Sequence, residues 1–528
     1  MTGRVSMNQI DSPPINPSMN AADAIICQGR QAAGDDGLAI IEEQRTFSYR
    51  QLDELINQFG NGMQHHNVQR ENRVLFLMDD CAELVAAYFA AIRIGAVAVA
   101  VSLRVAAKDL KHIITESRAV LLFVDAGLLP VYRQIENELH DKPILIINGA
   151  PHGQEESVAG FASGEDTALN SVLMSPDDMA LWIYSSGTTG QPKAVVHMHH
   201  DVLVADLHLS RNLNGKPGQR LFCTSKLFFA YALGNSMLAG LRSGMAIVLA
   251  SGWPDARHIV EVIEQYKPDF FFSVPTFYRT LLTSGEARNP AFKQLRCCVS
   301  AGEALPETLF KKWRDQTGLC IHEGLGSSET IFLYIANYPD NFQIGKTGRL
   351  QPWVEARLLD ETQHEINTPD TPGMLWIKTE SVADRYWNRQ QLSRATFVGE
   401  WYCTGDMLSV DSDGWWCYHG RQDSMLKISG QWVSPAEIED RAMSAQNVLE
   451  AAVVGRVDKD GLVRATLFVV PQHPVDDQDS YCEHVHAHLC DGLSVYKCPR
   501  NIRVVEALPR TETGKVKHFV LRQWLDQT

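Results

Sequence analysis

The first third of the chain alternates segments of helical spacing with short apolar runs. Between residues 23 and 171, helical spacing occurs in TFSYRQLDELINQFGNGMQ and ELVAAYFAAIRIG, and the apolar runs include RVLFLMDD and AVAVAVS. Apolar positions that recur every three to four residues predict amphipathic helices, whereas short continuous apolar runs predict buried strands. Their regular alternation predicts a layered α/β subdomain.

The same alternation resumes after Asp177. Strands are predicted at ALWIYSS, MAIVLAS, FFFSVP and CCVSAG, and a helix is predicted around VLVADLHLS. Because these elements follow the first group with little interruption, we expect a second layered α/β subdomain beside it.

The pattern changes beyond about Gly345, where short β-like stretches are separated by turn residues. In WYCTGDMLSVDSDGWWCYHG, the DSDG turn between two strands predicts a small antiparallel, β-barrel-like unit. From Asp423 onward, a helix at EIEDRAMSA and strands at LEAAVVGR and RATLFVV predict a small α+β domain. We therefore divide the chain into a disordered arm (1–20), a large N-terminal domain (21–422) and a C-terminal domain (423–528).

The composition restricts the classes of function. The 528 residues carry 48 Lys and Arg against 63 Asp and Glu, a net charge of −15, which argues against binding to nucleic acid or to an anionic membrane. The apolar run Leu84–Val101 is rich in alanine and suits a buried helix followed by a strand. The N-terminus lacks the features of a signal or transit peptide, and the 11 cysteines are scattered, so we expect a cytoplasmic protein without disulfides.

The main chemical signal is a segment rich in hydroxyl residues that follows an apolar strand. In YSSGTTGQPKAVVH, the positions from Ser185 to Lys193 include four hydroxyl residues, two glycines and one lysine. Glycines let the backbone approach a polyphosphate, hydroxyl and N–H groups donate to its oxygens, and the lysine supplies positive charge. The segment lacks the Gly-Lys-Ser/Thr triplet of the common nucleotide-binding loop, and a solvated turn is the alternative interpretation.

Four further segments follow in a fixed order: GLGSSET at Gly324–Thr330, YCTGD ending at Asp406, GRQDSMLKISG at Gly420–Gly430, and PRTETGK ending at Lys515. Together with the first segment they resemble the adenylate-forming superfamily, which includes acyl- and aryl-CoA ligases, carrier-protein adenylation domains and beetle luciferase. Within it, KLFFAYALGN, SAGEALPE and VLEAAVVG look most like benzoate-type CoA ligases.

The resemblance implies an ATP site. Lys193 and the hydroxyls near it would hold the β- and γ-phosphates, Asp406 would accept the ribose hydroxyls, and Glu329 would bind Mg²⁺, because a hard cation prefers carboxylate oxygen. The ATP-binding residues so implied are Ser185, Ser186, Gly187, Thr188, Thr189, Gly190, Lys193, Glu303, Glu323, Gly324, Gly326, Ser327, Asp406, Arg421 and Lys515. A dinucleotide fingerprint at Gly324-x-Gly326 is the alternative, but its third glycine is absent.

By the same resemblance, Lys515 and Lys193 are the catalytic residues. Lys515 would place a positive charge between the substrate carboxylate and the α-phosphate, two anions that repel each other. The C-terminal domain would then rotate about a hinge at Asp423 to admit a thiol. The implied CoA tunnel residues are Lys427, Ser429, Gly430 and Trp432.

The acyl pocket implied by the benzoate-type ligases favours a flat ring. Its residues would be Ala230, Tyr231, Ser300, Ala301, Gly302, Leu325 and Phe332. Amino-acid-activating relatives have an aspartate where Ala230 stands, so a substrate without an α-ammonium group is favoured. Benzoate-type ligases often have histidine where Phe332 stands, and glycine at the position of Ala194, and the effects of both departures stay open.

The sequence therefore predicts an enzyme that adenylates a small, benzoate-like acid with ATP and Mg²⁺ and transfers the acyl group to coenzyme A. Transfer to the phosphopantetheine arm of a carrier protein is the alternative, although no carrier segment follows Lys515. A third interpretation is a non-catalytic nucleotide sensor. The presence together of Lys193, Glu329, Asp406 and Lys515 argues against it.

We expect a monomer or homodimer. A metal site is not expected at His197–His200, nor at the alternating Cys and His residues of 482–490, which cannot share one helix face.

Overall fold

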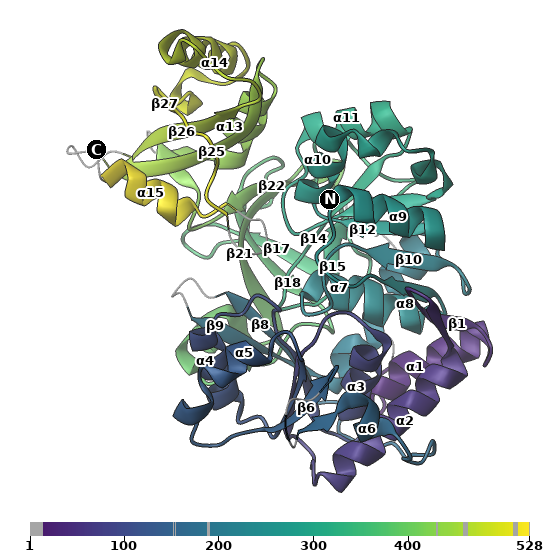
Figure 1. Ribbon diagram of the computed structural model, residues 1–528. Coiled ribbons are helices and arrows are strands. Elements are labelled where there is room, and N and C mark those ends of the chain that lie inside the picture. Colours follow the sequence, from purple (N-terminus) through teal and green to yellow (C-terminus); the bar gives the residue numbers. More distant parts are fainter. Residues whose placement is uncertain are drawn as a thin grey trace.

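The computed structural model describes residues 14–150, 153, 155–186, 191–428, 431–457, 463–510 and 516–526. It shows a mixed α/β protein with a large N-terminal part and a smaller C-terminal part (Figure 1). Several predicted site residues lie outside the described residues: Gly187, Thr188, Thr189, Gly190, Ser429, Gly430 and Lys515. The side chains of Ser186 and Trp432 are likewise not described.

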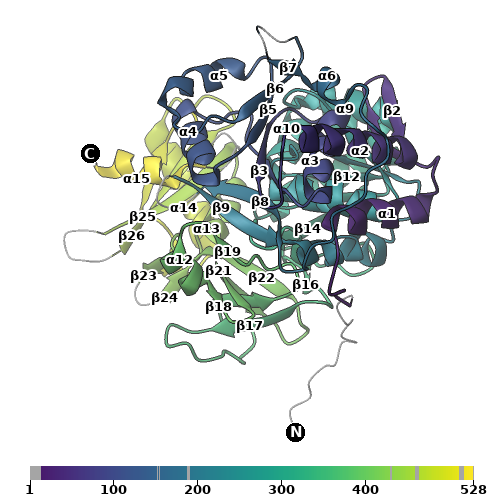
Figure 2. The same cartoon turned by 90° about the horizontal axis from the view of Figure 1, so that it is seen from below.

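One layer is a mostly parallel sheet of eight strands within the described ranges, in the order β19-β9-β8-β4-β3-β5-β6-β7. The strands are β3 (Arg73–Leu77), β4 (Val97–Ala100), β5 (Leu121–Asp125), β6 (Ile144–Asn148), β7 (Glu156–Ser157), β8 (Met179–Ser186), β9 (Pro192–Met198) and β19 (Arg385–Tyr386). Strand β9 runs antiparallel to both of its neighbours, β8 and the edge strand β19. In Figure 2, β19 lies beside β9 although nearly two hundred residues separate them in sequence.

A second layer is a sheet of nine strands in the part of the chain that the structure describes, in the order β16-β15-β14-β13-β12-β10-β11-β1-β2. The strands are β1 (Leu38–Glu42), β2 (Arg45–Ser48), β10 (Arg220–Cys223), β11 (Ala246–Leu249), β12 (Phe270–Ser273), β13 (Cys297–Ser300), β14 (Ile321–Gly326), β15 (Leu333–Ala336) and β16 (Arg349–Leu350).

Two strands join a different sheet from the one that their position in the sequence suggests. The sequence pattern assigns ALWIYSS to the second subdomain, but β8 pairs in parallel with β4 of the first sheet, with Ala98 opposite Leu181. Conversely, β1 from the N-terminal segment pairs with β11 of the second sheet. The assignment by chain order was therefore wrong for these strands, because distant pairing rather than local periodicity decides which sheet a strand joins.

Helices pack on both faces of each sheet and bury the main core between the sheets. The central helices are α1 (Ala21–Ala33), α2 (Tyr49–His65), α3 (Ala82–Arg93) and α8 (Ala239–Arg242). The outer face of the first sheet carries α4 (Ala107–Ser117) and α5 (Leu129–Arg133), and that of the second carries α9 (Ala256–Tyr266), α10 (Pro275–Ser284) and α11 (Glu307–Thr317). Shorter helices are α6 (Val158–Ala162), α7 (Ala230–Ala232) and α12 (Gln390–Thr396).

The start of α1 is tied to the core through residues of the predicted arm. The Asn20 side chain donates to the carbonyls of Ile92, Arg93 and Val172 and also accepts from the Ala22 N–H as the N-cap. The expected helix around VLVADLHLS is replaced by a 3₁₀ turn at His199–Val204 and a π turn at His208–Asn212. The Asp201 carboxylate accepts the Met198 N–H and so stabilises the tighter first turn.

The antiparallel unit consists of β17 (Glu355–Leu359), β18 (Gly373–Lys378), β20 (Phe397–Val398), β21 (Trp401–Val410) and β22 (Trp416–Arg421). The DSDG segment forms the turn between β21 and β22, as predicted, with Asp411 accepting the N–H groups of Asp413 and Trp415. A register shift between Met407 and Leu408 then places Asp406 opposite Arg421.

The C-terminal part has hydrophobic clusters of its own. It consists of strands β25 (Val448–Val457), β26 (Val463–Pro471) and β27 (Asn501–Val504), the pair β23 (Leu426–Ile428) and β24 (Gln431–Val433), and helices α13 (Pro435–Met443), α14 (Gln478–Gly492) and α15 (His518–Asp526). Its buried side chains come only from residues 426–525. No helix among the described residues is both long and apolar enough to cross a membrane.

Candidate functional site

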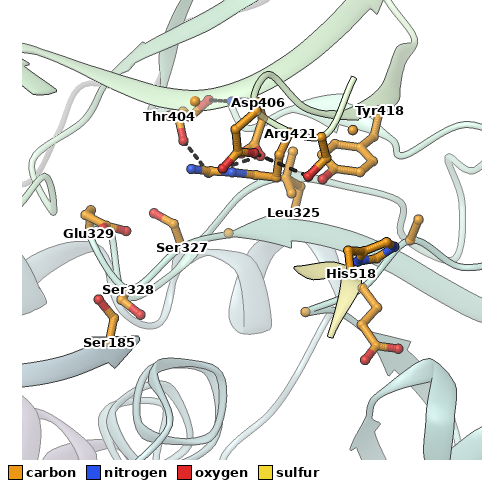
Figure 3. A pocket seen from close by; sticks show the side chains of 18 of the residues that line it. Ser185, Leu325, Ser327, Ser328, Glu329, Thr404, Asp406, Tyr418, Arg421 and His518 are labelled. Atoms are coloured by element: carbon orange, nitrogen blue, oxygen red, sulfur yellow. Dashed lines mark hydrogen bonds and ion pairs between the residues drawn. The ribbon is translucent and has the colours of Figure 1, made fainter. Parts of the chain in front are cut away.

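A cavity with a volume of about 1260 Å³ lies where the N-terminal and C-terminal parts meet. The loop after β14 and strands β21 and β22 line one part of it, and residues of the C-terminal part line another. Figure 3 shows Ser185, Ser327, Ser328 and Glu329 below Asp406 and Arg421, with His518 of α15 on the far side. The cavity therefore joins several of the predicted ATP-binding segments.

Strands β8 and β9 bring the ends of the predicted phosphate loop to this cavity. Ser185 pairs with Lys193, and residues 187–190 connect the two strands. Both Ser185 and Lys193 line the cavity, and the buried Ser185 Oγ has no hydrogen-bond partner among the described residues. A buried hydroxyl without a partner is costly, so this atom is suited to a ligand. Ala194, where the family usually has glycine, is buried within β9.

Glu329 is buried and held by three side chains. Lys193 Nζ lies 3.2 Å from Oε1, the Tyr386 hydroxyl donates to Oε1 at 2.7 Å, and the Tyr402 hydroxyl donates to Oε2 at 3.1 Å. Lys193 also lies 3.7 Å from the centre of the Tyr386 ring. Burial opposes ionisation of Glu329, but Lys193 and the Tyr386 hydroxyl outweigh it and lower the pKa of this carboxyl below its ordinary value. Glu329 is therefore an anion.

The geometry around Glu329 suits a magnesium ion that is bound mainly through phosphates. An ionised, buried carboxylate at the cavity wall is a hard oxygen donor of the kind that Mg²⁺ prefers, and such ions usually take only one or two protein carboxylates. Within the described ranges, no cluster of three His, Cys, Asp or Glu side chains forms a dedicated metal site.

Asp406 and Arg421 form a second polar group in the cavity. Arg421 Nη1 donates to the Thr404 carbonyl at 2.7 Å and to Asp406 Oδ1 at 3.3 Å. Gly405 has a φ of 75°, and a Cβ there would lie 2.7 Å from Arg421 Nη2, so glycine lets the guanidinium pack against the strand. Burial raises the pKa of Asp406 to about 6, although Arg421 opposes the shift.

This pKa predicts a pH dependence of ATP use. An ionised Asp406 accepts hydroxyl hydrogens better than a protonated one, and the protonated form predominates below about pH 6. We expect kcat/KM for ATP, which reports the free enzyme, to fall below that pH by up to about tenfold per pH unit. In Asp406→Asn the value should be lower throughout and this acid limb should disappear. An unchanged limb in the variant would assign it to another group.

The two predicted adenine-edge carboxylates occupy different places. Glu303 lines the cavity and accepts from the Thr276 hydroxyl at 3.1 Å. Glu323 is not among the cavity-lining residues; it accepts the Leu305 N–H at 3.1 Å, and burial raises its pKa to about 8. Of the glycines in β14, Gly326 lines the cavity, together with Ser327, whereas Gly324 pairs with Ala336.

The predicted acyl-pocket residues lie in and behind the cavity wall. Gly302 and Leu325 line the cavity, while Ser300, Ala301 and Phe332 are buried. Ala230 and Tyr231 begin the helical segment after the LFF run, and the Tyr231 hydroxyl donates to the Val299 carbonyl at 3.3 Å. These residues come from three segments that approach one another near the C-terminal end of β13.

The predicted hinge and tunnel residues differ in their distance from the cavity. Asp423 lines it, and its carboxylate accepts from the Ser424 hydroxyl at 3.3 Å. Lys427 forms an ion pair of 2.7 Å with Glu361 and does not line the cavity. In this arrangement of the two parts, β23 therefore faces away from the nucleotide segments.

Several residues that the sequence did not single out also contribute. Tyr386 and Tyr402 hold Glu329, and Arg279 on α10 lies 3.8 Å from Glu450 of β25, which also pairs with Arg510 at 2.7 Å. The contact between Arg279 and Glu450 joins the N-terminal and C-terminal parts on either side of the cavity. No local motif marks these residues, because their partners are far away in sequence.

The three histidines after the phosphate segment do not converge on a common point. His197 contacts Asp201, His199 Nδ1 accepts the Ala21 N–H at 2.9 Å, and His200 lies near Asp177 and Glu380. Burial lowers the pKa of His199 to about 4, so it stays neutral.

Comparison with known proteins gives matches over almost the whole chain. Residues 28–387 match the family model for AMP-binding enzymes, and residues 437–515 match the model for the AMP-binding enzyme C-terminal domain. A 3-hydroxybenzoate–CoA/4-hydroxybenzoate–CoA ligase of Thauera aromatica is 46% identical over 514 residues, which cover 97% of this chain and 98% of the relative. A 3-hydroxybenzoate–CoA ligase of Aromatoleum sp. (strain CIB) is 45% identical and covers 96% of this chain and 97% of the relative. The crystal structure of the anthranilate CoA ligase AuaEII in complex with anthranoyl-AMP matches with a TM-score of 0.90 at 30% identity, over 97% of this chain and 98% of that one.

Proposed function

The chain belongs to the AMP-binding enzyme family, and from that premise we propose that its preferred substrate is a hydroxylated benzoate, 3-hydroxybenzoate foremost. The enzyme is an ATP-dependent aryl-CoA ligase: it adenylates an aromatic acid and transfers the acyl group to coenzyme A, with release of AMP and pyrophosphate. The observation that carries the proposal for the acid is the identity of 45% or more to two hydroxybenzoate ligases over nearly their full length.

We propose that different residues of the cavity bind the ribose and the phosphates of ATP. In this proposal Asp406, which Arg421 contacts, accepts the ribose hydroxyls, and Lys193, which also lines the cavity, binds the phosphates. Lys193 now pairs with Glu329, so binding of a triphosphate requires that it exchange this partner for phosphate oxygens. Glu329, freed from Lys193 and still held by two tyrosines, would then hold Mg²⁺, which neutralises phosphate charge when bound.

Adenylation further needs a positive charge near the α-phosphate, for which we propose Lys515. It directly precedes Val516, which lines the cavity, as does Arg510 on the other side of the loop. The second half-reaction needs that space for the thiol, so we propose that the C-terminal part rotates about Asp423 and brings β23 and residues 427–432 to the cavity. This rotation would break the contact between Arg279 and Glu450.

Coenzyme A is the acceptor that the similarity to CoA ligases favours, and a phosphopantetheinyl carrier protein is the alternative. Assaying both acceptors with one competent acid separates them. The 11 cysteines, all of them free, are typical of a reducing compartment, so we propose that the enzyme acts in the cytoplasm.

A panel of acids tests the proposed substrate. We expect pyrophosphate release with 3-hydroxybenzoate to show a kcat/KM at least about tenfold above that with benzoate, because a site that hydrogen-bonds a ring hydroxyl discriminates against the analogue that lacks it. Aminobenzoates, cinnamates and short fatty acids complete the panel. A preference for unsubstituted benzoate would overturn the proposal for the hydroxyl, and a preference for a fatty acid would overturn the aromatic assignment.

A further inference from the structure

His197 and Lys193 tie the same strand to the same loop. The two residues are four apart in β9 and therefore lie on the same face of the strand. Lys193 Nζ contacts the Glu329 side chain, and His197 Nε2 lies 2.8 Å from the carbonyl oxygen of Ser328. Strand β9 thus contacts two consecutive residues of the loop that follows β14, once through a side chain and once through the backbone.

The second contact is oriented by a buried carboxylate. His197 Nδ1 lies 2.7 Å from Asp201 Oδ2, and the side chains of His197 and Asp201 are both 0% exposed. A carbonyl oxygen can only accept a hydrogen bond, so His197 Nε2 must carry a proton to donate to Ser328. The contact with Asp201 orients the imidazole ring so that Nε2 faces the Ser328 carbonyl.

Some contacts of the loop after β14 would be lost when a nucleotide binds, and others would be kept. The Lys193 contact is given up if Lys193 moves to the phosphates, as the proposed function requires. The tyrosine contacts and the Ala383 N–H bond to the Glu329 carbonyl fix the loop to β19, β21 and the segment before β19. The contact between His197 and the Ser328 carbonyl then keeps the loop after β14 attached to strand β9 once Lys193 has moved to the phosphates.

We infer that His197, oriented by Asp201, is a positioning residue for adenylation: it holds the Ser328 carbonyl so that Glu329 keeps its place relative to the strand that carries Lys193. This inference rests on the proposed function. Its effect falls on binding of magnesium-ATP and on adenylation, and it leaves the transfer of a finished acyl group to the thiol unchanged. Partners that orient a metal-binding side chain commonly contribute about 10- to 100-fold to affinity or activity.

Two substitutions at His197 separate its two contacts. In His197→Gln, the amide nitrogen can reach the position of Nε2 and still donate to Ser328, whereas in His197→Asn it reaches only the position of Nδ1. We expect His197→Asn to lower kcat/KM for magnesium-ATP in pyrophosphate release about 10- to 100-fold, and His197→Gln to stay within about threefold of the wild type. The matched control is His258→Asn on α9, a residue that does not line the cavity, and this variant should behave as the wild type.

Asp201→Asn gives an independent test. The Met198 N–H, which donates to the same carboxylate oxygen that faces His197 Nδ1, would hold the Asn carbonyl in that position. The ring proton would then sit on Nδ1 and leave Nε2 without one opposite the Ser328 carbonyl, so this variant should resemble His197→Asn. Calorimetric titration should show weaker binding of magnesium-ATP in both variants but unchanged binding of ATP in the presence of a chelator. Conversion of a chemically prepared 3-hydroxybenzoyl-adenylate to its CoA thioester should stay within about twofold.

The outcomes discriminate clearly. An equal loss in both half-reactions with a lowered melting temperature, or an unchanged kcat/KM for magnesium-ATP in His197→Asn, would overturn the inference. A loss in His197→Gln as large as that in His197→Asn would also overturn it, since the donor to Ser328 would then not matter. Failure of the wild type to release pyrophosphate with any benzoate would instead overturn the proposed function.

Discussion

Replacement of Lys515 by alanine is expected to abolish adenylate formation while thioester formation from a supplied adenylate continues. The substrate carboxylate must attack the α-phosphate, and a fixed cation between the two anions lowers that barrier without any reorganisation of solvent. Loss of such a group commonly costs on the order of 100-fold or more in rate. The second half-reaction starts from the mixed anhydride and needs no such cation between two anions.

The described residues around Lys515 support this role. Arg510 and Val516 form an isolated bridge and both line the cavity, and the Lys517 N–H donates to the Pro509 carbonyl at 2.7 Å, so the described residues on either side of 511–515 lie together beside the cavity.

Single-turnover assays of each half-reaction measure the effect. Pyrophosphate release with 3-hydroxybenzoate should fall at least 100-fold, on the order-of-magnitude scale of preorganised charge, and conversion of the supplied adenylate should stay near the wild-type rate. The control is Lys311→Ala, which removes a surface lysine paired with Glu307 on α11. Equal losses in both steps would contradict a two-position mechanism.

Glu329→Gln should have the second largest effect. Glutamine keeps the size of the side chain but removes the charge that faces Lys193 and that would hold Mg²⁺. Because the pKa of Glu329 lies below its ordinary value, the wild-type carboxylate is ionised throughout the neutral range, and its charge is lost only under acid conditions. We expect pyrophosphate release to fall on the order of 100-fold, as for the loss of other preorganised charges.

The measurement is a magnesium titration of pyrophosphate release at saturating acid. In Glu329→Gln the Mg²⁺ concentration for half-maximal rate should rise, and in the exposed control Glu365→Gln it should stay unchanged. A variant that lost rate but kept the wild-type magnesium dependence would show that Glu329 acts through Lys193 alone. Circular dichroism checks that the variant is folded.

The sequence by itself determined the elements and the chemistry that they carry. Apolar periodicity located most strands, and the DSDG segment located the turn between β21 and β22. Helix α14 was also predicted, and with it the spread of its cysteines and histidines around the helix. These features are local, because the side-chain period and the turn residues act over a few positions. The residues of the five motifs and their order indicated the adenylate-forming family, and the comparisons with known proteins confirm it.

Only the tertiary structure decided which distant segments meet. It placed β8 and β9 in the first sheet, brought Tyr386 and Tyr402 to Glu329, and set His197 against Ser328. These contacts join residues separated by 57 to 131 positions, and no short-range pattern encodes such partners. The order of strands in a sheet and the buried polar contacts form only when whole layers pack together. The residues that donate hydrogen bonds to a buried carboxylate therefore depend on the fold and not on its neighbours in sequence.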